Sequence, residues 1–461
     1  MRGAAERGRA RAGGKTRFIA KDTRAERANV AERANVTAAS VTPSRRVSPV
    51  LSVVAHSVLG MRLLHTSDWH LGRSFHREGM LDQQASFVDH LVDVVESERV
   101  DVVVLSGDVF DRALPPVDAV RVADEAFRRL AASRAAFVVT SGNHDSAQRL
   151  GFNAGLAESA GVYVRTRADD CDRPVVLEDE HGPVAIYGIP YLDPEALREP
   201  WQLPGRSHQA ALGAAMDRVR TDLAARPRGT RSVAMAHAFV AGAEASESER
   251  DISVGGVQMV ATSTFEGVDY TALGHLHGQH VMTPSIRYSG SPLAYSFSEA
   301  THRKGSWLVD LEADGLGEVA FIDAPVPRPL RRLRGDIEDL LADPRLADAE
   351  AAWCQVTLTD AVRPRGAMER LRRRFPHTLV LSFEPPDRST SGVPTARLGT
   401  GRSDHDITLD FLTEVRGSGA DEQEAQLLQR AVEACCGSDG DVLVGASASG
   451  SAEAPASEVT A

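Results

Sequence analysis

The sequence has few cysteines, few lysines and no long apolar run. Its 461 residues include four cysteines, whose spacing fits neither a zinc site nor a disulfide framework: Cys171, Cys354, Cys435 and Cys436. No apolar run approaches the roughly 18–20 residues of a membrane-spanning helix. These absences argue against a disulfide-stabilised secreted domain and a transmembrane protein, and they favour a reducing compartment such as the cytoplasm.

Acidic residues also outnumber basic residues. The chain has 52 Lys and Arg against 64 Asp and Glu, a net charge of −12. Residues 1–60 hold 12 of the basic and 4 of the acidic residues, a net of +8, so the remainder carries −20. Such an acidic body excludes attraction of nucleic acid to the whole surface. A polyphosphate partner has to be met by a local basic patch or by metal ions.

The first 60 residues read as an extension and not as a domain. They are rich in Arg and Ala, repeat AERANV in tandem, and show no sustained apolar periodicity. Three interpretations are open: a start assigned too early, with Met61 as the true first residue; a disordered tail; or a targeting segment. The first is preferred, because a strand pattern begins at Met61.

From Met61 onward, short apolar runs alternate with helical patterns, which predicts a layered α/β core. Prolines at 325, 327 and 329 mark a boundary, and a smaller α+β unit follows them. We expect these segments: a core domain at 61–325, a capping domain at 326–384, a linker at 385–405, a partner-binding segment at 406–437 that contains a short helix at 421–435, and a disordered tail at 438–461.

Potential metal ligands follow five of the predicted strands. Because carboxyl ends of parallel strands meet at one edge of a sheet, we expect these residues to converge: Asp68 and His70; Asp108 and Asp111; Asn143, His144 and Asp145; His237; and His275 and His277. Each motif alone is weak. A lone His237 would more often be a core histidine, and Gly-Asn-His-Asp is common turn chemistry. Five such motifs in a fixed order, each after a predicted strand, make coincidence a poor explanation.

Carboxylate, imidazole and amide ligands together suit Mn²⁺, Fe²⁺ or Zn²⁺ better than Mg²⁺ or Ca²⁺. A carboxylate can bridge two ions, and Asp108 is the natural candidate. Two ions about 3.5–4 Å apart can activate water and stabilise an in-line phosphoryl displacement. The residues leave the roles of His65 and His280 undecided.

The motifs resemble those of the calcineurin-like metallophosphoesterases, whose pattern runs DxH, GDxxD, GNH[DE], H and GHxH. Further segments are similar to one branch of that superfamily, bacterial DNA nuclease subunits: MRLLHTSDWHLG, LSGDVFDRALPP, SGNHDS, SERDISVGG and RYSGSPLAYSFSE. The resemblance covers Met61 to about Arg416. It implies a core of two sheets flanked by helices. Residues 1–60 match nothing in the family.

The resemblance also implies roles for residues. One metal ion would be held by Asp68, His70, Asp108 and His277, and the second by Asp108, Asn143, His237 and His275. His144 would face the scissile phosphate and either protonate the leaving oxygen or stabilise the transition state. Asp111 and Asp145 would orient the ligands and their loops.

The implied activity is a Mn²⁺-dependent 3′→5′ double-strand DNA exonuclease that also cuts single strands and hairpins. Such subunits act with a coiled-coil ATPase, two copies of each per complex, in DNA repair and recombination at the nucleoid. Two other readings stay open: a phosphoesterase for nucleotides or phosphoproteins, and a non-catalytic DNA-end-binding subunit.

The capping domain reverses the sign of the body's charge. Residues 326–377 carry 11 Arg and 8 acidic residues, a net of +3. Five arginines are candidates for contacting DNA phosphates: Arg331, Arg332, Arg372, Arg373 and Arg374. A solvated helix face is an equal alternative. The helix at 421–435 either docks on the ATPase or packs within this chain.

Overall fold

The computed structural model describes residues 60–250, 252, 259–386 and 403–437. Nearly all of the predicted extension at 1–60, and the predicted tail at 438–461, lie outside the described residues. Within the described ranges, no helix is long and apolar enough to cross a membrane.

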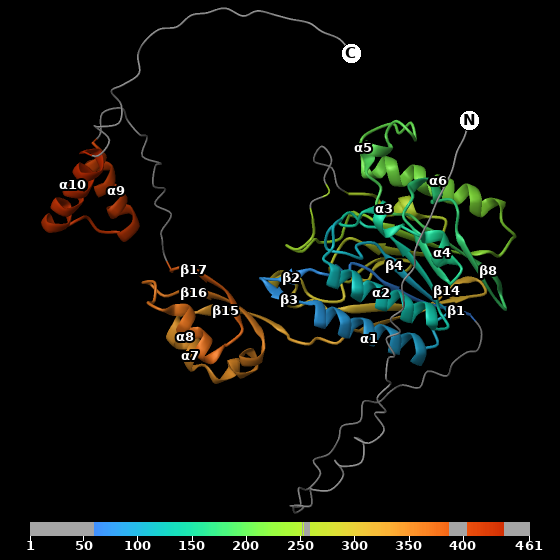
Figure 1. The fold of residues 1–461 in the computed structure, drawn as a ribbon, viewed down its shortest axis with the longest axis horizontal. Helices are drawn as coiled ribbons and strands as arrows, with labels where there is room; N and C mark the ends of the chain where they lie inside the picture. Colours follow the sequence, from blue (N-terminus) through green and yellow to red (C-terminus); the bar gives the residue numbers. More distant parts are fainter. Residues whose placement is uncertain (1–59, 251, 253–258, 387–402, 438–461) are drawn as a thin grey trace, which may run out of the picture. The chain divides into compact units, whose positions relative to one another are not determined.

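Two six-stranded sheets form the core domain (Figure 1). The first has the order β14–β13–β1–β4–β5–β6. Strands β1, β4, β5 and β6 are parallel, and β13 runs antiparallel to both β1 and β14. Their bounds are β1 Met61–Thr66, β4 Val102–Ser106, β5 Ala136–Thr140, β6 Val162–Arg165, β13 Gly305–Glu312 and β14 Gly315–Asp323.

The second sheet has the order β11–β12–β10–β9–β8–β7. Its central strands β12, β10, β9 and β8 are parallel, and antiparallel strands close both edges. The bounds are β7 Val175–Asp179, β8 Gly182–Gly188, β9 Arg231–His237, β10 Tyr270–Gly274, β11 His280–Thr283 and β12 Ile286–Tyr288. Strands β2 (Ser74–Phe75) and β3 (Glu78–Gly79) form a separate small hairpin.

Successive side chains of each strand point to opposite faces. Each sheet therefore contributes to one apolar core between the sheets and to another beneath its outer helices. On β1, Leu63 packs between the sheets with Ile186 and Val233. Its neighbour Leu64 packs with Phe87 of α1 (Leu81–Ser97) on the outer face. Helix α2 (Val117–Ala132) lies beside α1, and α6 (His208–Ala225) covers the second sheet (Figure 1). The core therefore has four layers, as predicted.

Short helices complete the core domain: α3 Ala147–Leu150, α4 Ala154–Glu158 and α5 Pro194–Leu197. Single 3₁₀ turns occupy Ala168–Asp170, Thr262–Phe265 and Phe297–Glu299. The near-continuous Val and Leu of β1, β4 and β5 follow from this layering, because strands covered on both faces have no polar side.

The smaller domain is a three-stranded parallel sheet, β15–β16–β17, with helices on one face. Its elements are β15 Leu330–Gly335, α7 Ile337–Ala342, a 3₁₀ segment Pro344–Ala351, β16 Trp353–Leu358, α8 Ala367–Arg374 and β17 Thr378–Phe383. Leu333, Val356, Leu371 and Phe375 form its own apolar core. The predicted smaller unit of strands and helices is present in this segment.

Two helices follow, α9 (Asp404–Arg416) and α10 (Glu422–Gly437). The predicted linker at 385–405 is too long at its end, because α9 begins at Asp404. The reason is a capping box, in which Ser403 accepts from the Asp406 amide and the Asp406 carboxylate accepts from the Ser403 amide. The start of α10 has a similar pair: Asp421 and Glu424 exchange backbone-to-side-chain hydrogen bonds of 2.9 and 2.8 Å.

Candidate metal centre

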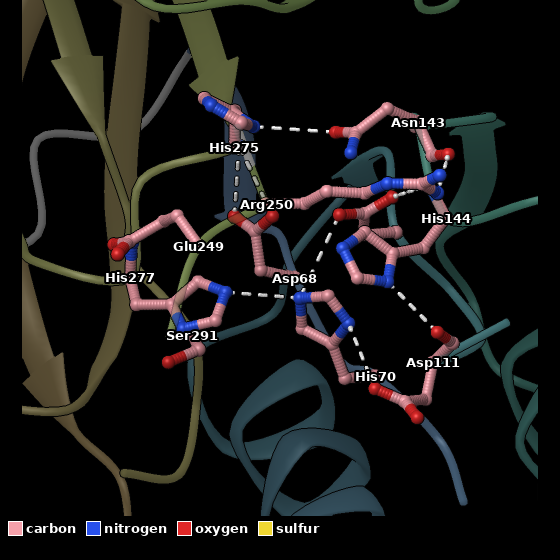
Figure 2. A network of polar contacts seen from close by, with 12 residues as sticks. Asp68, His70, Asp111, Asn143, His144, Glu249, Arg250, His275, His277 and Ser291 are labelled. Atoms are coloured by element: carbon pink, nitrogen blue, oxygen red, sulfur yellow. Dashed lines mark hydrogen bonds and ion pairs between the residues drawn. The ribbon is translucent and has the colours of Figure 1, made fainter. Parts of the chain in front are cut away.

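Eight polar residues gather where five strands of the two sheets end. We call them the strand-end cluster: Asp68 and His70 after β1, Asp108 after β4, Asn143 and His144 after β5, His237 at the end of β9, and His275 and His277 after β10. The strands are parallel within each sheet, so their carboxyl ends lie at one edge. Figure 2 shows side chains from both sheets pointing toward one another.

Ser106 joins the two sheets at this edge. Its hydroxyl donates to the Ala272 carbonyl of β10 at 2.9 Å, and its carbonyl lies 3.0 Å from Nδ1 of His237. This second contact places the hydrogen of a neutral His237 on Nδ1 and leaves Nε2 free as a ligand atom. Gly107 follows, and a Cβ there would lie 2.3 Å from the His237 ring, so only glycine fits.

Asp108 lies between the two halves of the cluster. Its Oδ2 is 3.6 Å from Nε2 of His70 and 3.4 Å from Nε2 of His237. Its Oδ1 accepts from the His144 amide at 2.8 Å. One carboxylate therefore faces an imidazole from each sheet, which is the placement that a bridging ligand requires.

The other ligand atoms converge on either side. On one side, Nε2 of His70 and Nε2 of His277 are 2.9 Å apart. On the other, Oδ1 of Asn143 lies 2.9 Å from Nε2 of His237 and 3.2 Å from Nδ1 of His275. Three groups among the described residues have ligand atoms within 4.8 Å of one another: Asp68, His70 and His277; His70, Asp111 and His144; and Asp68, Asp108 and His237.

The chemistry of these atoms fits divalent cations. Burial lowers the pKa of His70 and of His275 well below the ordinary value, so both rings are neutral and can offer a lone pair. Burial also opposes protonation of His237, but the charge of Asp108 outweighs it and raises the pKa of His237 to about 9. The Asn143 amide nitrogen is buried with no hydrogen-bond partner in the described part of the chain. The Asp108 carboxylate therefore gives the cluster a preference for positive charge.

The backbone of the cluster adopts conformations that are unusual for residues other than glycine. Asp68, His70, Asp108 and His275 have φ values of 54°, 47°, 50° and 105°. Such left-handed residues are costly and persist where the surroundings hold them, often at functional sites. Here the amides of Asp68 and His70 donate to the carbonyls of Gly107 and Asp108 at 3.1 and 3.0 Å.

Asp145 ties two ligand loops together. Its carboxylate accepts from the amides of Val109, Phe110 and Gly142 at 2.9–3.0 Å. The first two amides directly follow Asp108 on one loop, and the third directly precedes Asn143 on the other. Burial raises the pKa of Asp145 to about 7. The residue holds both loops and is not itself among the converging ligand atoms.

His144 lies at the open side of the cluster. Its Nδ1 donates to the Asp111 carbonyl at 2.7 Å, so its Nε2 is free to meet a substrate (Figure 2). The ring centroid is 4.7 Å from that of His70. The Asp111 carboxylate lies 3.9 Å from Nδ1 of His70. Asp111 therefore orients His144 through its backbone and faces His70 with its side chain.

Comparisons with known proteins bear on this geometry. Residues 61–279 match the model of the calcineurin-like phosphoesterases, and residues 326–414 match that of the type 5 capsule protein repressor C-terminal domain, a family also called SbcD_C. A curated relative, the D component of the nuclease SbcCD of Staphylococcus epidermidis, is 27% identical over 325 residues. That alignment covers 70% of this chain and 85% of the relative.

The two family matches and the curated relative together support a place in the SbcD branch of the calcineurin-like phosphoesterases. Two solved structures are also similar over 57% of this chain. The protein TT1561 of Thermus thermophilus has a TM-score of 0.34 at 13% identity over 99% of its length. An archaeal phosphodiesterase has a TM-score of 0.27 at 11% identity over 100% of its length.

Sequence reasoning missed a buried network behind His277. Ser248 Oγ lies 2.6 Å from Nδ1 of His277 and donates to Oε1 of Glu299 at 2.5 Å. Lys304 forms an ion pair with Glu299 and donates to the His277 carbonyl at 2.8 Å. Glu249 accepts from the His277 amide at 2.7 Å. Such partners fix the ring and tautomer of a ligand. Two signals were available: Ser248, Glu249 and Glu299 lie in the family-like segments SERDISVGG and RYSGSPLAYSFSE, and Lys304 is among only three lysines in the chain.

His65 is a packing residue. It is fully buried in β1, with Nδ1 2.9 Å from the Tyr270 hydroxyl and Nε2 3.1 Å from the Leu273 carbonyl. Burial lowers its pKa to about 3. The ring therefore bridges the two sheets in its neutral form. His280 lies on β11, where its Nε2 is 3.1 Å from the Glu244 carbonyl.

Four of the five arginines predicted to contact DNA have partners within the small domain. Arg331 pairs with Asp348, and Arg373 pairs with Glu369, both exposed. Arg372 donates to the Thr378 carbonyl, and Arg374 to the carbonyls of Leu340 and Asp343. Arg332 is exposed and has no polar partner in the described part of the chain. DNA contact by these five residues stays a prediction.

Proposed function

We propose that this chain is a two-metal DNA nuclease subunit. One observation carries the proposal: the Asp108 carboxylate lies between His70 and His237, within 3.6 and 3.4 Å. Asp68, His70, Asp108 and His277 would hold one ion, and Asp108, Asn143, His237 and His275 the other. Mn²⁺ is the ion we favour for this mixed nitrogen and oxygen set. Bound ions would supply an activated water and charge stabilisation for the phosphoryl group.

The chain's own residues supply positioning and proton transfer. The hydrogen bond from Nδ1 of His144 to the Asp111 carbonyl fixes the ring and leaves Nε2 outside this hydrogen bond. From there His144 would protonate the leaving oxygen or stabilise its developing charge. Asp145 ties the loop of Asp108 to the loop of Asn143, so that both ligands and His144 keep a fixed arrangement.

The proposed activity is 3′→5′ exonuclease on duplex DNA and endonuclease on single strands and hairpins. The proposed domains are a nuclease domain at 61–325, a capping domain at 326–384, a linker at 385–403 and a partner-binding segment at 404–437. The linker ends at 403 because α9 begins at Asp404. Within the cell we place it in the cytoplasm at the nucleoid, in DNA repair, recombination and replication.

The test uses the full chain with Mn²⁺ on duplex DNA labelled at either end, beside a small phosphomonoester. We expect shortening from the 3′ end of the duplex. Hydrolysis of the phosphomonoester alone contradicts the proposal and favours the small-substrate reading. DNA binding without any hydrolysis favours the non-catalytic reading.

His144→Ala should reduce cleavage by about 10²–10⁴-fold, the usual contribution of a positioned acid or base, while metal content stays that of the wild type. The matched control is His90→Ala on α1, outside the cluster, which should cleave normally. Undiminished cleavage by the His144 variant contradicts the role assigned to that ring.

A coiled-coil ATPase of the SbcC type is the proposed partner, in an assembly with two copies of each subunit. Support comes from α9 and α10, whose side chains Phe411 and Leu427 are 63% and 58% exposed. Apolar exposure of this kind is typical of a helix that packs on a partner. Co-expressed subunits should elute together in size-exclusion chromatography, and Phe411→Glu should separate them. A complex that survives this change places the contact elsewhere.

A further inference from the structure

An open pocket lies beside the strand-end cluster. It has a volume of about 500 Å³ and is lined by Arg73, Ser74, Asp111, Arg112, His144 and Arg250. Three arginines thus face a single carboxylate in a chain whose net charge is −12. A local excess of positive charge in an acidic protein indicates that this pocket receives an anion. We call these three residues the pocket arginines.

Arg73 is held in place with one nitrogen unused. Its Nη2 donates to the Ser248 carbonyl at 2.6 Å, and its guanidinium carbon lies 5.1 Å from the Tyr295 ring centroid. Its Nε is 3.7 Å from the Asp111 carboxylate. Its Nη1 is buried and has no hydrogen-bond partner within the described ranges. A guanidinium fixed in this way, with a free N–H, is prepared for a phosphate oxygen.

Arg112 and Arg250 each contact a neighbour of His144. Arg112 is exposed and lies 3.5 Å from the carboxylate of Asp111, whose carbonyl accepts from His144. Arg250 is exposed and donates to the carbonyl of Asn143, the residue before His144, at 3.5 Å. Figure 2 shows the Arg250 side chain extending toward Asn143 and His144. Both contacts are long, so both guanidinium groups are available to a ligand.

We propose that the pocket arginines form a subsite for the sugar-phosphate backbone of a single nucleic acid strand, holding the phosphates on either side of the one that reaches His144. This rests on the proposed function and names how that site holds its substrate. Three cations around an open pocket exceed what one small phosphate ester needs. Contact with phosphates and not bases makes the subsite indifferent to sequence.

The experiment measures binding separately from cleavage. Full-length wild type, Arg73→Gln, Arg112→Gln and Arg250→Gln are titrated into a fluorescein-labelled single-stranded oligonucleotide without metal, at several salt concentrations, and followed by anisotropy. Cleavage of the same oligonucleotide with Mn²⁺ is measured in parallel. The control is Arg228→Gln, an exposed arginine before the amino end of β9, whereas the cluster lies at the carboxyl end.

Each pocket variant should weaken binding roughly tenfold, as loss of a charge-assisted hydrogen bond predicts, and raise KM more than it lowers kcat. The slope of log K against log salt should become shallower by about 0.7 for each phosphate that is no longer neutralised. Arg228→Gln should match the wild type. Arg112 and Arg250 are exposed, so their variants test the subsite even where Arg73→Gln disturbs folding.

Unchanged affinity and salt slope in both the Arg112 and Arg250 variants overturns the subsite, whatever the cleavage assay shows. If the variants bind weakly as expected but the wild type cleaves nothing, the subsite stands and the proposed nuclease activity fails. An equal loss for all variants including Arg228→Gln also overturns the subsite, because it indicates diffuse attraction.

Discussion

The core domain and the small domain are both built from parallel strands and covering helices, but they differ in the polar side chains that they bury. At one edge of the core domain, carboxylates and imidazoles such as Asp68, Asp108 and His237 are almost completely buried. In residues 326–386, Thr378 is the one buried polar side chain, and it donates to the Phe375 carbonyl.

This difference distinguishes a candidate functional site from ordinary packing. Burying an ionisable group is costly unless it is paired or binds a metal, so a concentration of such groups marks a site. The arginines of the small domain are mostly exposed and paired with neighbours, which costs little and indicates little. Charge buried at strand ends is therefore the stronger guide to function in this chain.

The largest expected effect comes from removing the central carboxylate. Asp108→Ala should abolish metal binding and reduce DNA cleavage by more than the roughly 10²–10³-fold that one lost transition-state hydrogen bond costs. Metal content by elemental analysis and the end-labelled assay measure this. Asp310→Ala, which breaks an ion pair with Arg62 elsewhere in the core domain, should keep its metal. Two ions per chain in the Asp108 variant contradict the bridging role.

A smaller effect is expected behind His277. Glu299→Ala leaves Lys304 buried without its partner, which should lower the free energy of unfolding by about 3–5 kcal/mol. It should also weaken metal affinity by about 10–100-fold, since Ser248 loses the acceptor that orients it against His277. Urea denaturation and metal titration measure the two changes.

The control for Glu299 is Arg303, the residue that precedes Lys304. Arg303 pairs with Asp323, and both side chains are about 60% exposed (58% and 62%). Arg303→Ala should change stability by no more than about 1 kcal/mol and leave metal affinity unaltered. Equal losses in the two variants would remove the distinction between buried and exposed pairs.

The smallest effect on stability is expected in the small domain. Arg331→Gln combined with Arg332→Gln should change the free energy of unfolding by less than about 1 kcal/mol. If these residues bind DNA phosphates, the salt slope for duplex binding should become shallower by about 0.9 for each phosphate that is no longer neutralised. Arg345→Gln, an exposed arginine of the same domain that pairs with Asp343, is the control. An unchanged slope assigns Arg331 and Arg332 to a solvated face.

Much of the fold was predictable because its signals are local. Val and Leu runs predicted β1, β4 and β5, and Gly107 and Gly142 stand directly before the ligands that follow β4 and β5. Helix α9 was not predicted, because its signal is a single capping box next to a linker rich in turn residues. Apart from the end of the linker, the predicted domain bounds and the extension at 1–60 stay predictions.

By itself, the sequence predicted which residues would carry chemistry and that their side chains would end up together, and the structure brings those side chains together. Ligands such as Asp108 and His237 follow buried parallel strands, and strand direction alone sends those ends to one edge. The tertiary structure decided what no periodicity encodes: that Asp108 lies between imidazoles from different sheets, that Glu299 and Lys304 support His277, and that Arg73 keeps a free N–H at the pocket. These relations join residues far apart in the chain, so they depend on how the two sheets pack and not on local pattern.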